Sequence, residues 1–157
     1  MREDSATRIV RAAPERVFAA FVDADLLLSW LPPDGMTAAL TSFEPSVGGG
    51  FRMVLTYIDP GGSPGKATAD ADVSEVRITE IVRPRRIVWL VDFPSDDPAY
   101  AGTMTMTWAF APVSDGTSVV VRARDVPPGI DAGAHVAGLV SSLAHLAAVV
   151  EGERRPG

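Results

Sequence analysis

Cysteine is absent from this 157-residue sequence. Its absence excludes disulfides, thiolate nucleophiles and cysteine-based metal sites. Proteins of the reducing cytoplasm do without disulfides, so this composition favours a cytoplasmic location. The length is enough for one domain with a substantial hydrophobic core.

Histidine is nearly absent too, with only His135 and His145. They stand ten residues apart, which is neither the i, i+4 spacing of a metal-binding pair nor an HExxH motif. The adjacent acids Asp96 and Asp97 supply too few oxygens to hold a cation alone. The glycine run at 48–50 has no lysine and no helix after it, unlike a phosphate-binding loop. We therefore expect no metal ion and no cofactor.

Positive charge is also in short supply, since 14 lysines and arginines face 20 acids and the net charge is −6. Such a chain has no general electrostatic attraction to nucleic acid or to anionic lipid. The N-terminal residues lack the apolar core of a signal peptide. No uninterrupted apolar run approaches the ~20 residues that span a bilayer. Neither nucleic acid nor a membrane is expected as a partner.

The longest periodic segment covers residues 130–151. Its apolar residues recur at three- and four-residue spacing, which places them on one face of a helix. That face is predicted to hold Val136, Leu139, Val140, Leu143, Ala147 and Val150. Ser141, Ser142 and His145 are predicted on the opposite, solvated face. Asp131 suits the N-cap of this helix.

Before this helix, short apolar runs alternate with turn-forming residues. A first strand is predicted at residues 5–11, and two short helices follow, opened by Pro14 and by Asp23. Six further strands are predicted at residues 40–44, 51–58, 71–82, 87–93, 102–111 and 117–124. The clearest alternation lies in 102–111, where large apolar residues alternate with threonine. A glycine-rich loop is expected at 59–65.

This order of elements predicts an α+β fold. Strands joined by short turns pair antiparallel. We therefore expect a curved antiparallel sheet of about six or seven strands around the long C-terminal helix, with two short helices after the first strand. One face of the sheet has to be covered, and the segment 130–151 is long enough to cover it. Residues 1–157 are expected to form a single domain with an ordered core at about 5–151.

Four short stretches, in the right order, resemble a known family. They are AAPERVF at 12–18 followed by Trp30, VGGGFR at 47–52, IVRPRRIVW at 81–89 and GLVSSLAHL at 138–146. They resemble the opening helices, the glycine hinge, the E-x-x-P-P-E-R-L-V-x-T-W segment and the G-W-x-x-S-L-x-x-L helix of the activator of Hsp 90 ATPase homologue-like (AHSA-type) family. That family is part of the SRPBCC superfamily, also called the START or polyketide cyclase superfamily, which has the helix-grip fold.

The sequence departs from the family pattern at two places. Leu139 stands where the family usually has tryptophan, a change that would alter a pocket beside the helix. Arg83 and Arg85 replace the first proline and the acid of the Pro-Pro-Glu turn. The resemblance implies a cavity between the curved sheet and the terminal helix. Some superfamily members bind lipids, hormones or polyketides there, and a few catalyse cyclisation or dehydration.

Large, polarizable side chains on the predicted strands suit such a cavity, because ligand pockets are mostly apolar with a few placed polar groups. The expected lining is Trp30, Phe51, Met53, Trp89, Met104, Met106, Trp108, Leu139 and Leu143. Plain core packing is the alternative for each of them. Arg52 and His135 are the possible polar pocket groups, Arg52 for an acidic ligand group and His135 as an acid or base at the mouth.

The leading hypothesis is binding of a small hydrophobic molecule, lipid- or polyketide-like, in this cavity. One alternative is an enzyme of polyketide cyclase/dehydratase or hydrolase type, for which the candidate polar residues are His135, Arg52, Asp92 and Tyr100; no catalytic residue is assigned. Another is a protein-interaction module, either a chaperone partner (Hsp 90 ATPase activator-like) or a homodimer. A large exposed apolar patch would favour the interaction module.

Overall fold

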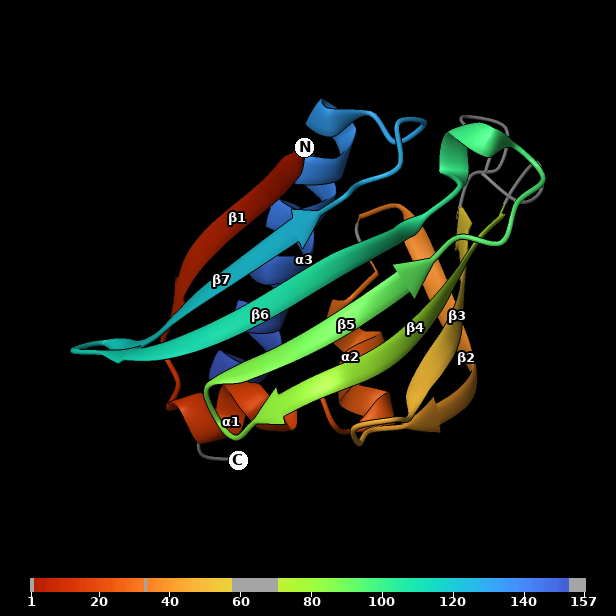
Figure 1. Cartoon of the computed structure of the whole chain (residues 1–157). Helices are drawn as coiled ribbons and strands as arrows, with labels where there is room; N and C mark the ends of the chain where they lie inside the picture. The colour runs from red at the N-terminus through yellow and green to blue at the C-terminus, as the bar shows by residue number, and fades with distance from the viewer. Residues whose placement is uncertain (1, 33, 58–70, 153–157) are drawn as a thin grey trace.

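The computed structural model describes residues 2–32, 34–57 and 71–152 (Figure 1). The glycine-rich loop expected at 59–65 lies outside the described residues. In chain order the elements are β1 (Glu3–Val10), α1 (Pro14–Ala19), α2 (Ala24–Trp30), β2 (Met36–Glu44), β3 (Gly50–Tyr57), β4 (Ala71–Val82), β5 (Arg86–Asp92), the 3-10 helix η1 (Pro98–Tyr100), β6 (Thr103–Val113), β7 (Gly116–Arg124) and α3 (Ala132–Gly152).

The strands form one antiparallel seven-stranded sheet in the order β1-β7-β6-β5-β4-β3-β2. The first strand therefore pairs with the last one, and the chain reaches the opposite edge only after passing through α1 and α2. The sheet curves around the helices, with α3 behind β1 and β7 in the view of Figure 1. The predicted α+β helix-grip fold is confirmed.

Strand boundaries differ from the prediction where the hydrophobic pattern is weak. β1 begins at Glu3 and β2 at Met36, earlier than residues 5 and 40. After Met36, the start of β2 carries the small or polar side chains of residues 37–39, so backbone pairing with β3 defines it and apolar alternation does not. The short helix η1 was not predicted; it begins where the Asp97 side chain accepts a hydrogen bond from the Ala99 amide at 2.9 Å.

The helix α3 begins as predicted, because Oδ2 of Asp131 accepts a hydrogen bond from the Ala134 amide at 2.8 Å. Its predicted faces are partly wrong. Val140 is 51% exposed, whereas Ser142 is 6% exposed and Leu146 is fully buried. The physical reason is that α3 packs against β1, α1 and α2 together, so its buried arc is wider than one stripe and is shifted from it.

One 18-residue window of α3 has a mean hydropathy of 1.6, which by length and composition is enough to cross a membrane. In this fold, large apolar residues of the same window pack inside the protein. Leu139, Leu143, Leu146 and Val150 are buried against the sheet and the short helices. Closing the sheet therefore uses these large apolar side chains of α3, and 33% of the 18-residue window is buried inside the structure.

Aromatic side chains connect the short helices to the sheet. The ring of Phe21 lies 4.7 Å from that of Trp30 and 5.0 Å from that of Trp108, measured between centroids. The row continues along the sheet, with 5.2 Å from Trp108 to Trp89 and 5.2 Å from Trp89 to Phe51. Tilted and edge-to-face pairs of this kind are favourable and fix ring orientation. The row thus spans the distance from α2 to β3.

The glycine run 48–50 leads from β2 into β3. Gly48 has a φ of +90° and Gly50 a φ of +158°. A Cβ at Gly48 would meet nothing within 4 Å, but a Cβ at Gly50 would lie 1.9 Å from the carbonyl oxygen of Val76. Gly48 is therefore needed for its backbone conformation alone, and Gly50 because β4 passes too close for any side chain.

This difference predicts unequal effects for two similar substitutions. Gly48→Ala is expected to cost about 1–2 kcal/mol, the strain of a left-handed residue with a Cβ. Gly50→Ala is expected to cost clearly more, because the backbone of β4 has to move. Urea unfolding followed by tryptophan fluorescence measures both. Equal losses would show that the close approach of β4 does not constrain this position.

Candidate functional site

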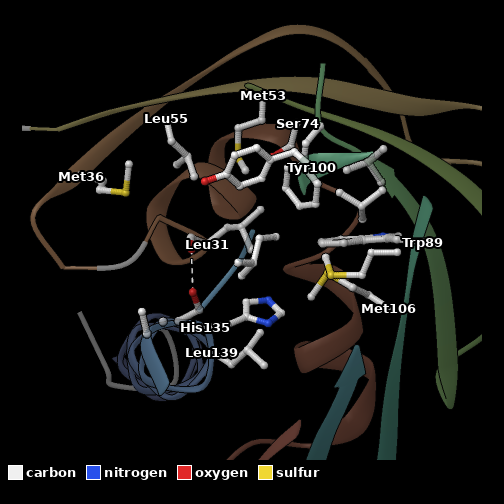
Figure 2. Close-up of a pocket in the computed structure, with 18 of the residues that line it drawn as sticks. Leu31, Met36, Met53, Leu55, Ser74, Trp89, Tyr100, Met106, His135 and Leu139 are labelled. Atoms are coloured by element: carbon white, nitrogen blue, oxygen red, sulfur yellow. Dashed lines mark hydrogen bonds between the residues drawn. The ribbon is translucent and has the colours of Figure 1, made fainter. Parts of the chain in front are cut away.

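A cavity of about 490 Å³ lies between α3 and the inner face of the sheet (Figure 2). Its volume is in the range of pockets that hold small molecules. The strands β3 to β6 supply its apolar wall, made of Phe51, Met53, Leu55, Val76, Trp89, Val91, Met104 and Met106. These residues occupy every second position of their strands, so strand alternation points them all to one face.

The helix contributes mostly short side chains. Ala134, Gly138 and Ser142, spaced four residues apart, all line the cavity together with Leu139. A Cβ at Gly138 would meet nothing within 4 Å. The space exists because this side of α3 is too slim to reach the sheet.

Some residues of the predicted lining do reach the cavity, and others do not. Phe51, Met53, Trp89, Met104, Met106 and Leu139 line it. Trp30, Trp108 and Leu143 do not, since they are at most 1% exposed and pack in the solid core beside it. Strand and helix patterns identify inward residues, but they do not tell a filled interior from an empty one. The expectation for these three residues is therefore corrected.

The expectation that Arg52 enters the pocket is also corrected. Its Nη1 lies 3.4 Å from Oε2 of Glu75, and both side chains are exposed on the outer face of the sheet. Asp92 accepts a hydrogen bond from Oγ1 of Thr103 at 2.6 Å and is not part of the lining either. Pairing with neighbours on the same face holds both charges in solvent, where they need no desolvation.

His135 does line the cavity, and it is part of a network (Figure 2). Its Nδ1 lies 2.7 Å from Oδ2 of Asp4, a carboxylate that is only 5% exposed. Arg2 donates to the same carboxylate from Nε at 3.2 Å and from Nη2 at 2.8 Å. The hydrogen bond from Arg2 lowers the pKa of Asp4; burial opposes this and His135 adds to it. Asp4 is therefore ionised near neutral pH and accepts from both partners.

Sequence reasoning missed Arg2 and Asp4. Asp4 and His135 are 131 residues apart, and only the fold brings β1 beside the first turn of α3. One signal was available: Asp4 stands in the same alternation phase as the buried Val10. An acid at an inward position of a strand needs a partner inside the protein.

Other polar groups border the cavity. Ser74 is 7% exposed, and its hydroxyl and that of Tyr100 make no hydrogen bond with another described residue. Asp131 lies at the same end as His135. Within the described part of the chain, no three side chains of metal-binding type come together.

His145 is not a solvated surface residue as predicted. Its Nδ1 lies 3.0 Å from the carbonyl oxygen of Pro32, and its Nε2 lies 2.7 Å from Oδ1 of Asp34. Ser142 also donates to the carbonyl of Leu31 at 2.7 Å. These contacts fasten the linker after α2 to α3, which gives His145 a structural position away from the cavity.

Comparison with known proteins agrees with this geometry. The family model described as "Activator of Hsp90 ATPase homolog 1-like protein" matches residues 11–151. A crystal structure of a protein from Chromobacterium violaceum is 30% identical, has a TM-score of 0.83, and aligns over 95% of this chain and 96% of that one. No curated protein matches the chain.

Two more distant structures share the fold. The AHSA1 protein from Silicibacter pomeroyi is 21% identical, with a TM-score of 0.75 and coverage of 97% of this chain and 99% of that one. The AHSA1-like protein from Aeromonas hydrophila is 18% identical, with a TM-score of 0.74 and coverage of 98% and 94%.

The network around Asp4 predicts a pH-dependent contribution to stability. Asp4→Asn is expected to destabilise the protein at neutral pH, because the amide loses the charge-assisted bonds from Arg2. The folded-state pKa of Asp4 is lowered, and its unfolded value is about 3.9. The wild type therefore has a higher free energy of unfolding than Asp4→Asn, and this difference is fully present above the unfolded-state pKa. It disappears as the pH falls through the lowered folded-state pKa of Asp4.

Urea unfolding of both proteins, at pH 7 and in steps below about pH 4, measures this difference. Asp96→Asn, at an exposed acid in the β5–β6 connection, is the matched control and should leave stability unchanged at every pH. A stability difference for Asp4→Asn that stays constant down to the lowest pH at which both proteins fold would contradict the assignment.

Proposed function

The chain belongs to the family of activator of Hsp90 ATPase homolog 1-like proteins, and from this premise we propose that it binds a small, largely apolar molecule between α3 and the sheet. The observation that carries the proposal is the open space of about 490 Å³ beneath α3. Protein interiors are otherwise close-packed, and unfilled volume costs stability. An occupant would recover the lost contacts.

The lining supports an apolar body for that occupant. Met53, Met104 and Met106 have flexible, polarizable side chains that adapt to different ligand shapes. Trp89 adds a flat aromatic surface (Figure 2). Apolar side chains make up most of the lining, and Ser74, Tyr100 and His135 add a small number of hydrogen-bonding groups, which suits a lipid- or polyketide-like molecule.

The other candidate functions have less support from the described residues. The exposed large apolar side chains Ile9, Val47, Val82, Val113 and Val140 stand singly on different parts of the chain. Single residues of this kind are normal and do not indicate a chaperone or dimer interface. Of the polar residues considered for an enzyme, His135 and Tyr100 line the cavity, whereas Arg52 and Asp92 do not.

A pair of neighbouring helix substitutions tests ligand binding. Gly138→Leu is expected to fill the cavity and to weaken binding of the neutral fluorescent probe N-phenyl-1-naphthylamine at least tenfold. The helix itself should tolerate the change, because leucine favours helix more than glycine by nearly 1 kcal/mol. Ala137→Leu, one residue earlier and exposed, is the control and should bind the probe like the wild type.

Fluorescence titration gives the affinities, and thermal unfolding checks that both variants fold. The proposal fails if the wild type does not bind the probe, or if both variants bind it equally well. If the probe binds as expected, mass spectrometry of protein purified from its own host identifies the natural ligand.

A further inference from the structure

The imidazole of His135 is held in one orientation at the polar end of the cavity. Its Nδ1 is 2.7 Å from Oδ2 of the buried Asp4, which is itself held by two donors of Arg2. A carboxylate bound in this way only accepts, so Nδ1 carries the hydrogen. The hydrogen bond fixes both the tautomer and the ring orientation. In the neutral form of the ring, Nε2 with its lone pair remains for a ligand.

Nε2 has no hydrogen-bond partner among the described residues. The ring projects from α3 toward Met106 on the opposite wall and lies next to Leu139 (Figure 2). His135 is only 16% exposed, so the cavity is its main access to other molecules. In the neutral ring, Nε2 is the acceptor that a molecule in the cavity can reach. The group that completes this site is therefore a hydrogen-bond donor.

The charges at this end favour a neutral donor. Asp4 and Asp131 bring two carboxylates close to His135, and the guanidinium of Arg2 offsets one of them. This balance disfavours a ligand anion beside the imidazole. A ligand cation would lie against methionine and leucine side chains, where burial of a charge is expensive. A neutral hydroxyl avoids both costs.

The shape of the wall favours a ring in the ligand. Trp89 and Tyr100 both present aromatic rings to the cavity (Figure 2). Offset or edge-to-face contact with such rings stabilises aromatic ligands beyond the area they bury. A hydroxyl attached to an aromatic or enolic carbon is also more acidic than an alkyl alcohol, and it donates a stronger hydrogen bond to imidazole.

We propose that the cavity selects molecules with an apolar, ring-containing body and a neutral hydroxyl of phenol or enol type, which donates a hydrogen bond to Nε2 of His135. Asp4 is the residue that positions the ring, with Arg2 holding Asp4. This inference rests on the proposed function, since it assigns the class of molecule that the same cavity binds.

Four probes with the same body separate the possibilities: naphthalene, 2-naphthol, 2-naphthoate and 2-naphthylmethylammonium. Isothermal titration near neutral pH measures their affinities for the wild type, for His135→Leu and for the control Ala137→Leu, at an exposed position of α3. The wild type and the control should bind 2-naphthol about tenfold more tightly than naphthalene, as one good hydrogen bond allows. His135→Leu should bind 2-naphthol and naphthalene with equal affinity.

Several outcomes would overturn the inference. Equal binding of 2-naphthol and naphthalene by the wild type, or a preference that survives in His135→Leu, would remove His135 as the acceptor. Tightest binding of 2-naphthoate or of the ammonium probe would show that the site takes a charge. In each of these cases, the proposed function would still hold if naphthalene binds the wild type and Gly138→Leu abolishes that binding. If none of the four probes binds, the proposed function fails as well.

Nitrogen-15 NMR of the wild type gives a test that needs no folded variant at position 135. The spectrum should show His135 protonated on Nδ1 and free on Nε2, and 2-naphthol should shift the Nε2 resonance whereas naphthalene should not. In Asp4→Asn the tautomer should become mixed, and the preference for 2-naphthol should fall. Protonation on Nε2 in the neutral wild-type ring, or an Nε2 resonance that does not respond to 2-naphthol, would overturn the inference.

Discussion

Packing of Trp30 against Phe21 and Trp108 is the contact on which the rest of the structure depends. Trp30 is fully buried, and its indole N–H donates to the carbonyl of Ala20 at 2.9 Å, so α2 is fixed relative to the end of α1. These bulky rings hold the short helices at a set distance from the sheet, and α3 packs on those helices. The distance between α3 and the sheet is thus set by aromatic side chains beside the cavity.

The cavity follows from that constraint. Along the aromatic row the interior is solid, but beyond Trp89 the helix presents mostly short side chains to the sheet, those of Ala134, Gly138 and Ser142. The helix does not move inward to close the gap, because polar contacts also hold it. His135 is bound to Asp4 of β1, and Ser142 is bound to the carbonyl of Leu31. The same contacts leave one imidazole nitrogen as an acceptor inside an apolar space.

Much of the fold was predictable because its signals are local. The alternation of Met104, Met106 and Trp108 with threonines identified a strand and its inner face, and the burial of β6 confirms it. Asp131 marked the start of α3. The site was harder to predict from the sequence. Trp30, Trp108 and Leu143 have the same inward pattern as the true lining residues, although they pack in the core. Periodicity reports which way a side chain points and carries no information about what lies opposite.

The sequence by itself determined the main helices and strands, their antiparallel pairing and the apolar inner face, because propensity, turn residues and hydrophobic periodicity act over a few neighbouring residues. Only the tertiary structure decided that the space beneath α3 stays open, and that Arg2 and Asp4 meet His135 there. Those contacts join residues 131 positions apart. They exist because β1 returns to pair with the last strand, β7, at the edge where α3 begins. A pattern of neighbouring residues carries no information about contacts across such a sequence separation. The position of the His135 imidazole in the cavity therefore depends on the tertiary fold.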